Sequence, residues 1–279
     1  MSGFLENHPA LWRGLFPFPA ADSHKYSRGT ALIRGGGLMT GATRLAARAA
    51  QRMGAGLVTL AAPAAVLPIY AESLESVIVR PCDGVTEWQA LINDPRLPVL
   101  LIGPGLGLGA AQAEEVRTAL AAQRPGVIDA DALTVFAADP DLLFQSLHAG
   151  CVLTPHEGEF ARLFGTVEGD KAVRALAAAK RAGCVVLLKG AETVIASPDG
   201  RAIINRNAPP WLATAGAGDV LAGMILGLLA QHMPPFDAAC AAAWAHGQIA
   251  SRHGPGLIAE DIVARIPPVL QEITAISGR

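Results

Sequence analysis

Short apolar runs alternate with longer amphipathic segments along most of the chain. The runs with the length of a buried strand are 30–34, 56–61, 98–103, 126–130, 151–155 and 184–189. The clearest helical periodicity lies at 41–53, which Gly54 ends, and further helices are expected at 109–122, 170–182, 219–231 and 236–252. Such alternation predicts βαβ units. The expected fold class is therefore α/β, with a mostly parallel central sheet and helices on both faces.

Length and composition favour a single domain. The chain has 279 residues, of which 51% are hydrophobic and 16% are charged, and this is enough to bury one large core. No repeat, low-complexity tract or charged linker divides it. We therefore expect one domain over 1–279, in which 1–23, with Pro9, Pro17 and Pro19, forms an irregular N-terminal arm.

Charge and the absence of targeting patterns favour small-molecule chemistry in the cytoplasm. The formal net charge is −2, so neither nucleic acid nor an anionic membrane is an expected partner. The start of the chain lacks the pattern of a signal peptide, and the uncharged stretch 54–71 is interrupted by Pro63 and Pro68. The four cysteines form no CxxC pair and are expected to be buried thiols rather than disulfides or zinc ligands.

Two glycine-rich stretches join a predicted strand to a predicted helix. In "IRGGGLMTGA" (33–42) the spacing is not that of a dinucleotide-binding fingerprint, and the next strand ends in Ala61-Ala62-Pro63 where a ribose-binding acid is expected. A Rossmann dehydrogenase is therefore disfavoured. In "IGPGLGLG" (102–109) the glycines leave backbone N–H groups free to bind an anion.

Polar side chains lie at or just after the ends of the predicted strands 126–130, 151–155 and 184–189. Asp129 and Asp131 could hold Mg²⁺ through water or cap the following helix. His156 is three residues before Glu159, but no further His or Cys nearby completes a metal site, so we expect no protein-held metal. His156 is better interpreted as a contact to substrate, with capping of the next helix as the alternative. Lys189 either pairs with phosphate or is an exposed hairpin lysine.

The stretch "ATAGAGDVLAG" (213–223) places glycines and an aspartate in front of a long apolar run. Gly216, Ala217 and Gly218 can present bare N–H groups at a helix N-terminus, where the helix dipole also favours negative charge. They form a candidate anion hole. Asp219 beside it is a candidate base for a hydroxyl that attacks a phosphoryl group. The alternative is an ordinary Asp N-cap.

These motifs resemble those of a known family. A late helix opened by a GxGD-type motif resembles the ribokinase-like superfamily of small-molecule kinases. The order of "GPGLG", "DADAL", "LTPHEGEFARLFG", "LKGAETVIASPDG" and "LATAGAGDVLAG" is similar to that in ADP/ATP-dependent NAD(P)H-hydrate dehydratases. The resemblance covers residues 24–270, and the TPHxGE and ATxGxGDVLAG stretches are its most specific parts.

The resemblance implies a ribokinase-like fold and a hydro-lyase that repairs the hydrated nicotinamides NADHX and NADPHX. ADP or ATP, with Mg²⁺, would phosphorylate the ring hydroxyl, and loss of phosphate would restore the double bond. Asp219 would be the base beside the anion hole of Gly216, Ala217 and Gly218. The implied dinucleotide contacts are Ala42, Gly105, His156 and Asp219, and those to ADP or ATP are Lys189, Gly190, Ala191, Glu192, Thr193 and Gly218. We also expect a homo-oligomer, with a tetramer as one form.

One segment departs from the family pattern, and two other functions compete. Relatives carry glycines where this chain has Asn-Ala-Pro-Pro-Trp-Leu at 207–212, so the substrate contacts of this loop are not carried over. A ribokinase-like kinase for a vitamin precursor or sugar would use the same base and anion hole. A nucleotide-sensing protein without turnover would not need Asp219.

Overall fold

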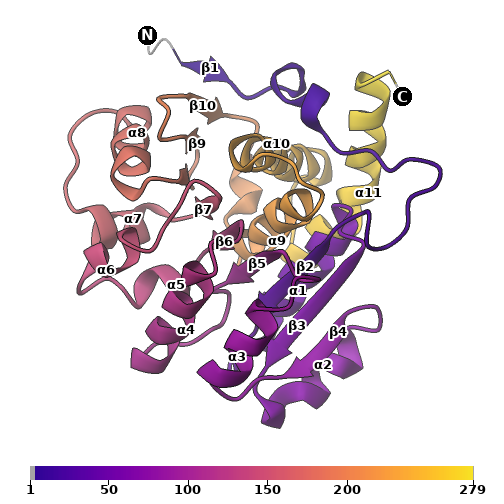
Figure 1. The fold of residues 1–279 in the computed structure, drawn as a ribbon. Coiled ribbons are helices and arrows are strands. Elements are labelled where there is room, and N and C mark those ends of the chain that lie inside the picture. The colour runs from indigo at the N-terminus through magenta and orange to yellow at the C-terminus, as the bar shows by residue number, and fades with distance from the viewer. Residues whose placement is uncertain (1–3, 279) are drawn as a thin grey trace.

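The computed structural model describes residues 4–278, which form a ten-stranded sheet in the order β1-β10-β9-β8-β7-β6-β5-β2-β3-β4 (Figure 1). Neighbouring strands are parallel except that β9 is antiparallel to both β8 and β10. The strands are β1 (Leu5–Glu6), β2 (Thr30–Arg34), β3 (Leu57–Ala62), β4 (Ile78–Pro81), β5 (Val99–Ile102), β6 (Gly126–Ile128), β7 (Cys151–Leu153), β8 (Val185–Leu188), β9 (Thr193–Ala196) and β10 (Ala202–Asn205).

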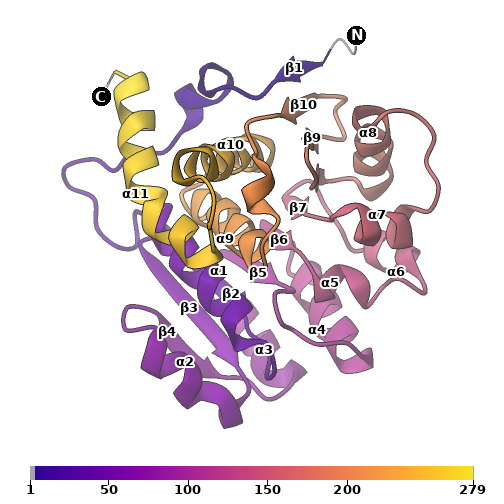
Figure 2. The same cartoon turned by 180° about the vertical axis from the view of Figure 1, so that it is seen from behind.

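Helices cover both faces of this sheet (Figures 1 and 2). They are α1 (Thr40–Arg52), α2 (Leu67–Ser73), α3 (Val85–Ile92), α4 (Ala110–Ala121), α5 (Asp131–Thr134), α6 (Pro140–Phe144), α7 (Glu157–Phe164), α8 (Lys171–Ala182), α9 (Ala217–Ala230), α10 (Pro235–His253) and α11 (Ala259–Ile276). Short 3-10 turns occupy Pro9–Leu11, Arg13–Leu15, Ala64–Val66 and Pro210–Leu212.

The core has two parts because successive strand residues point to opposite faces. In β2, Ala31 and Ile33 pack with α1, α9, α10 and α11, whereas Leu32 packs with the residues of α3, α4, α7 and α8. A strand buried on both faces is mostly apolar, which is why these runs stand out in the sequence. The predicted α/β class with a mostly parallel sheet is confirmed.

The N-terminal segment runs along the top of the molecule from β10 towards α11 (Figures 1 and 2). Its strand β1 pairs with β10, and the buried Asn7 fixes it to the body. The Asn7 amide nitrogen donates to Asn205 Oδ1 at 2.9 Å and to the carbonyl of Cys240 at 2.7 Å. Trp12 Nε1 donates to Asn7 Oδ1 at 3.1 Å. The segment is therefore attached by specific polar contacts.

Helix α9 lies unusually close to α1. A Cβ at Gly223 would overlap the carbonyl oxygen of Ala46, and one at Gly227 would lie 2.5 Å from that of Ala50. Glycine is thus required for this approach rather than for a special backbone conformation. The packing places the first turn of α9 at the carboxyl edge of the sheet, where β6, β7 and β8 end.

All four cysteines are buried and unpaired, as expected from the sequence. Among the helices of residues 4–278, none has the length and apolar character needed to cross a membrane.

Candidate active site

The polar residues selected from the sequence meet where neighbouring strands end. Strands β6, β7 and β8 are adjacent in the sheet, so Asp129, His156 and Lys189 follow side by side. His156 and Lys189 also form an isolated parallel bridge. Ligands of open α/β sheets bind at this edge.

The first turn of α9 has the geometry of an anion site. Its N-cap is Gly216, which has a φ of +86° and makes no side-chain capping hydrogen bond. Asp219 is the third residue of the helix and does not occupy the N-cap position, so the alternative interpretation of Asp219 as an ordinary cap is wrong. The dipole of this 14-residue helix favours negative charge at its N-terminus.

Asp219 has the protonation behaviour of a base that works near neutral pH. Burial raises its pKa to about 6, and the negative charge of Asp129 acts in the same direction, followed by those of Asp131 and Glu159. The positive charge of Lys189 opposes them. A carboxylate with this pKa is ionised at neutral pH yet binds a proton more strongly than an ordinary one.

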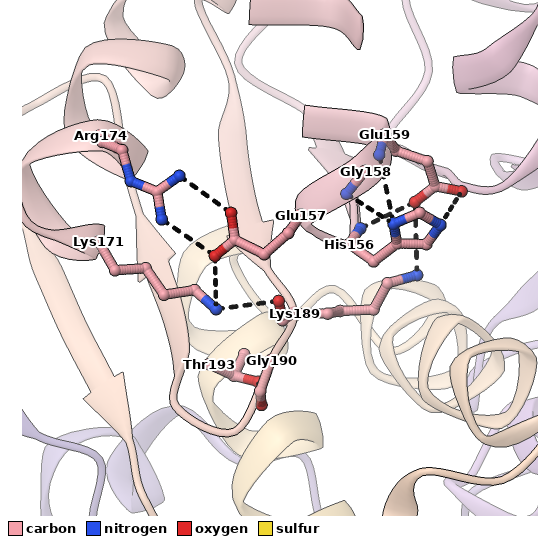
Figure 3. A network of polar contacts seen from close by, with 9 residues as sticks. All are labelled: His156, Glu157, Gly158, Glu159, Lys171, Arg174, Lys189, Gly190 and Thr193. Carbon is pink, nitrogen blue, oxygen red and sulfur yellow. Dashed lines mark hydrogen bonds and ion pairs between the residues drawn. The ribbon is translucent and has the colours of Figure 1, made fainter. Parts of the chain in front are cut away.

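Lys189 is held inside a set of carboxylates and is not an exposed hairpin residue. Its Nζ lies 2.9 Å from Asp129 Oδ1, and its side chain is 20% exposed. Glu159 Oε2 lies 4.0 Å from the same Nζ (Figure 3). Burial alone would lower its pKa, but the charges of Asp129 and Glu159 outweigh burial and raise it. A Cβ at Gly218 would be 3.5 Å from Nζ, so the ammonium lies against the first turn of α9.

A pocket of about 480 Å³ opens beside this ammonium. Its volume suits a small-molecule ligand. It is lined by most residues that the resemblance assigns to ADP or ATP, namely Lys189, Gly190, Ala191, Thr193 and Gly218. Glu192 is the exception, because its carboxylate is paired with Arg206 at 2.7 Å. The structure thus brings five of these six residues to one cavity.

The same pocket contains residues that the sequence did not indicate. The departing loop contributes Pro209, Pro210 and Leu212, which supply apolar surface. The buried His246 of α10 lines the pocket as well, and burial lowers its pKa to about 4 although a hydrogen bond to the backbone of Ala217 opposes this. His246 is therefore neutral, and no sequence pattern marks it within an alanine-rich helix.

The two glycine-rich loops meet backbone to backbone. A Cβ at Gly36 would overlap the carbonyl oxygen of Gly105, and one at Gly105 would be 2.5 Å from the carbonyl oxygen of Met39. The Thr43 hydroxyl donates to the carbonyl of Pro104 at 2.9 Å. Ala42, in the first turn of α1, is therefore brought close to Gly105, as the predicted dinucleotide site requires.

Neither aspartate after β6 caps α5. Asp129 is 1% exposed and accepts from Lys189, while Asp131 Oδ2 accepts from the backbone N–H of Gly107 at 2.8 Å. The N-cap of α5 is Ala130, whose φ of +49° and ψ of −119° are strained for a residue with a Cβ. Strain at this point directs the two carboxylates to their separate partners.

Replacing Ala130 with glycine should therefore stabilise the protein. Such strained conformations cost about 1–3 kcal/mol, and the extra freedom of glycine in the unfolded chain cancels part of the gain. We expect a net increase of about 1 kcal/mol in the free energy of unfolding, measured by urea denaturation. A lower free energy of unfolding in the variant would show that Ala130 is not strained.

His156 caps α7. Its Nδ1 accepts from the N–H groups of Gly158 and Glu159 at 3.0 and 3.2 Å, and Glu159 Oε2 accepts from the His156 N–H at 2.8 Å (Figure 3). The capping alternative is therefore what the structure shows. The ring is still 54% exposed, so a contact between Nε2 and substrate stays a prediction.

Glu157 points away from this cluster and pairs with Lys171 and Arg174 at 3.2 and 2.9 Å (Figure 3). Across residues 4–278 there is no group of three or more His, Cys, Asp or Glu side chains arranged to hold a metal ion.

Comparison with known proteins gives a consistent set of matches. The family model described as NAD(P)H-hydrate dehydratase matches residues 30–267. A bifunctional NAD(P)H-hydrate repair enzyme of Salinibacter ruber is 40% identical over 96% of this chain and 53% of its own length. An ADP-dependent (S)-NAD(P)H-hydrate dehydratase of Neisseria meningitidis is 36% identical over 91% of this chain and 88% of its own. The chain spans about half the length of the bifunctional relatives it matches.

Solved structures give the same result for the fold. An ADP/ATP-dependent NAD(P)H-hydrate dehydratase from Bacillus subtilis, co-crystallised with ATP/Mg²⁺, superposes with a TM-score of 0.84 at 30% identity, over 98% of this chain and 100% of that one. A ribokinase-like superfamily protein from Enterococcus faecalis has a TM-score of 0.88 at 24% identity, over 98% of this chain and 97% of that one. The second match establishes a ribokinase-like fold.

Proposed function

Because the chain belongs to the NAD(P)H-hydrate dehydratase family, we propose that it converts NADHX and NADPHX back to NADH and NADPH with ADP or ATP as phosphoryl donor. The observation that carries this proposal is the position of Asp219, a half-buried carboxylate with a raised pKa, in the first turn of α9. The same turn borders the pocket of about 480 Å³, since Ala217 and Gly218 line it. A base and an anion site are thus adjacent, as phosphoryl transfer requires.

The reaction follows from this arrangement in two stages. In the first, Asp219 takes the proton of the ring hydroxyl, the oxygen attacks the terminal phosphorus of the donor, and the bond from that phosphorus to the donor oxygen breaks. Gly216, Ala217 and Gly218 stabilise the phosphoryl charge through the helix N-terminus, and Lys189 adds a full positive charge. In the second, the ring carbon–oxygen bond breaks, phosphate leaves, and loss of a proton from the adjacent ring carbon restores the double bond.

We propose two subsites on these residues. The donor occupies the pocket lined by Lys189, Gly190, Ala191, Thr193 and Gly218. The hydrated dinucleotide lies over Ala42 and Gly105, and His156, whose backbone pairs with that of Lys189, contacts it as well. Asp219 stands where these subsites meet.

The described residues do not fit a protein-held Mg²⁺. The carboxylates of Asp129 and Asp131 are engaged by Lys189 and by the N–H of Gly107. We propose that Mg²⁺ enters as a complex with the donor phosphates. We also propose that 1–279 is one ribokinase-like domain with 1–23 as its arm, that copies of the chain associate, and that the protein works in the cytoplasm.

The test is to supply NADPHX with ADP or ATP and to follow the absorbance of reduced nicotinamide. Its recovery, with one phosphate released for each molecule repaired, would support the proposal. A phosphorylated product that accumulates would indicate a kinase for a vitamin precursor or sugar. Nucleotide binding without turnover would indicate a sensor.

The wild-type rate should depend on pH through Asp219. Because only the carboxylate accepts a proton, kcat/KM should fall as the pH drops through about 6, the raised pKa of Asp219. A pH series of initial rates at saturating donor measures this. A rate that holds down to the ordinary carboxyl value of 3.8 would contradict the raised pKa.

Replacing His156 should weaken binding of the hydrated dinucleotide. A hydrogen bond to a charged ligand contributes about 1.5–3 kcal/mol, so the KM for NADPHX should rise roughly tenfold to a hundredfold in His156→Ala. His156→Asn is the matched variant, since asparagine can still cap α7. Both variants should show the raised KM for NADPHX, but only His156→Ala should also have a lower free energy of unfolding. A rise in the KM for the donor alone would place His156 in the other subsite.

A further inference from the structure

We propose that Asp129 is a positioning residue that holds the Lys189 ammonium against the first turn of α9 and, through it, sets the charge state of Asp219. This rests on the proposed function of Asp219 as the base. Asp129 is not among the residues that the family resemblance places in either subsite. Its side chain touches Lys189 and not the pocket.

Asp129 is buried, and its side chain is paired with that of Lys189. Val127 packs in the core beneath α9, so Asp129, two residues later, points to the same face of the sheet. The side chain is 1% exposed, and a buried carboxylate is unfavourable unless it is paired. Lys189 Nζ at 2.9 Å supplies that partner.

The backbone of Lys189 is fixed independently of its side chain. Its N–H donates to the carbonyl of Pro155 at 2.8 Å, and its own carbonyl accepts from Lys171 Nζ at 2.9 Å. The four-carbon stem can still rotate, and a flexible lysine loses considerable entropy when it is held in one position. Contact with Asp129, and at longer range with Glu159, decides that the ammonium faces Gly218.

Asp129 acts on Asp219 in two opposite ways. The charged groups that face Asp219 are Asp129 and Asp131 after β6, Glu159 of α7, and Lys189 after β8. Asp129 raises the pKa of Asp219 by its own charge, yet it also holds the ammonium that lowers this pKa. From α10, His246 is kept neutral by burial and adds no charge near neutral pH.

This pairing makes a distinctive prediction for the two partners. Asp129→Asn removes the negative charge but keeps an oxygen that can accept from Lys189, so the ammonium stays in place and the pKa of Asp219 should fall. Asp129→Ala removes both the charge and the contact that holds the ammonium, so the pKa of Asp219 should be higher in this variant than in Asp129→Asn. Removing the charge of Lys189 leaves the carboxylates unopposed, so the pKa should rise. If Asp129 acted on Asp219 by its charge alone, Asp129→Asn and Asp129→Ala would shift the pKa of Asp219 equally.

The experiment compares Asp129→Asn, Asp129→Ala and Lys189→Met in the full chain. Carbon-13 NMR of aspartate carboxyls, with the Asp219 signal assigned from Asp219→Asn, follows the titration directly. We expect a downward shift of about one pH unit in Asp129→Asn and an upward shift of about one in Lys189→Met. The acid limb of the kcat profile should move in the same directions. If Lys189→Met does not fold, Lys189→Gln takes its place.

Asp131→Asn is the matched control. It removes a carboxylate from the same loop, but its partner is the N–H of Gly107 rather than Lys189. In Asp131→Asn the pKa of Asp219 should fall by less than it does in Asp129→Asn. In Lys189→Arg, which keeps the positive charge, the titration of Asp219 should match that of the wild type. Equal titrations of Asp219 in Asp129→Asn and Asp129→Ala would overturn the proposal, because they would show that Asp129 does not hold the ammonium in place. The NMR titration needs no turnover, so failure of the dehydratase assay would reject the proposed function separately.

Discussion

Asp219→Asn is expected to lower the rate of dehydration by about a hundredfold to ten-thousandfold, because general-base catalysis contributes that much. The amide has nearly the shape of the carboxylate but cannot accept the proton of the ring hydroxyl. The side chain of Asp219 does not cap α9, so the helix loses no hydrogen bond at its N-terminus. Nucleotide binding in the pocket should stay close to wild type. Single-turnover rates and a separate ADP-binding measurement would distinguish these effects.

The same substitution should change stability with a defined pH dependence. The pKa of Asp219 is raised from 3.8 to about 6 in the folded protein, so the ionised form disfavours the folded state. This destabilisation is complete above about pH 6 and absent below about pH 4, where the carboxyl is protonated whether the chain is folded or not. Asp219→Asn should therefore resist urea better than the wild type at pH 8 but not at pH 3.5.

Two outcomes would contradict the proposed role. A variant that keeps most of the wild-type rate would show that another group accepts the proton. A variant that is less stable than the wild type at pH 8 would show that the Asp219 carboxylate stabilises the fold and that its charge is not disfavoured there. Loss of activity together with a gain in stability is the combination that identifies a site maintained for catalysis.

Six strands that are buried on both faces were predicted from apolar runs in the sequence, whereas β9 and β10, which are equally buried, and the exposed β4 were not among those runs. The runs behind β2, β3, β5, β6, β7 and β8 are mostly apolar because helices cover both sides. The edge strand β4 reads Ile-Val-Arg-Pro and is largely exposed. Helix α11 contains Pro267 and Pro268, which normally indicate a break, although both are tolerated within its 18 residues.

The sequence predicted which polar residues follow each strand, but it did not predict which of these residues contact one another. Parallel strands deliver their following residues to one edge, so Asp129, His156 and Lys189 were recognisable as candidates. Sequence does not reveal that Lys189 pairs with an aspartate 60 positions away. Nor does it reveal that Glu192 turns from the pocket to Arg206, because this depends on where β10 returns beside β9.

A second large effect is expected where α9 packs on α1. Gly223→Ala would place a Cβ on the carbonyl oxygen of Ala46 and 2.7 Å from its Cα, and these are backbone atoms of a helix. Overpacking of this kind typically costs 1–3 kcal/mol, and the absence of a movable side chain here points to about 3 kcal/mol. The helix propensity of alanine, about 1 kcal/mol better than that of glycine, offsets only part of this. Urea denaturation should show a lower free energy of unfolding for Gly223→Ala.

Gly218→Ala is the matched control in the same helix. It should impair activity without lowering stability. A Cβ there meets only Lys189 Nζ, at 3.5 Å, which is an ordinary contact with the end of a flexible side chain. Stability should be unchanged or higher by about 0.4–1 kcal/mol, because alanine restricts the unfolded chain. The added methyl projects beside the ammonium, where the donor phosphates bind, so the KM for ADP should rise and kcat should fall. If Gly218→Ala kept wild-type kinetics while gaining stability, the glycine would serve the helix and not the anion hole. Since both substitutions add one methyl to α9, only their positions separate a packing role from a catalytic one.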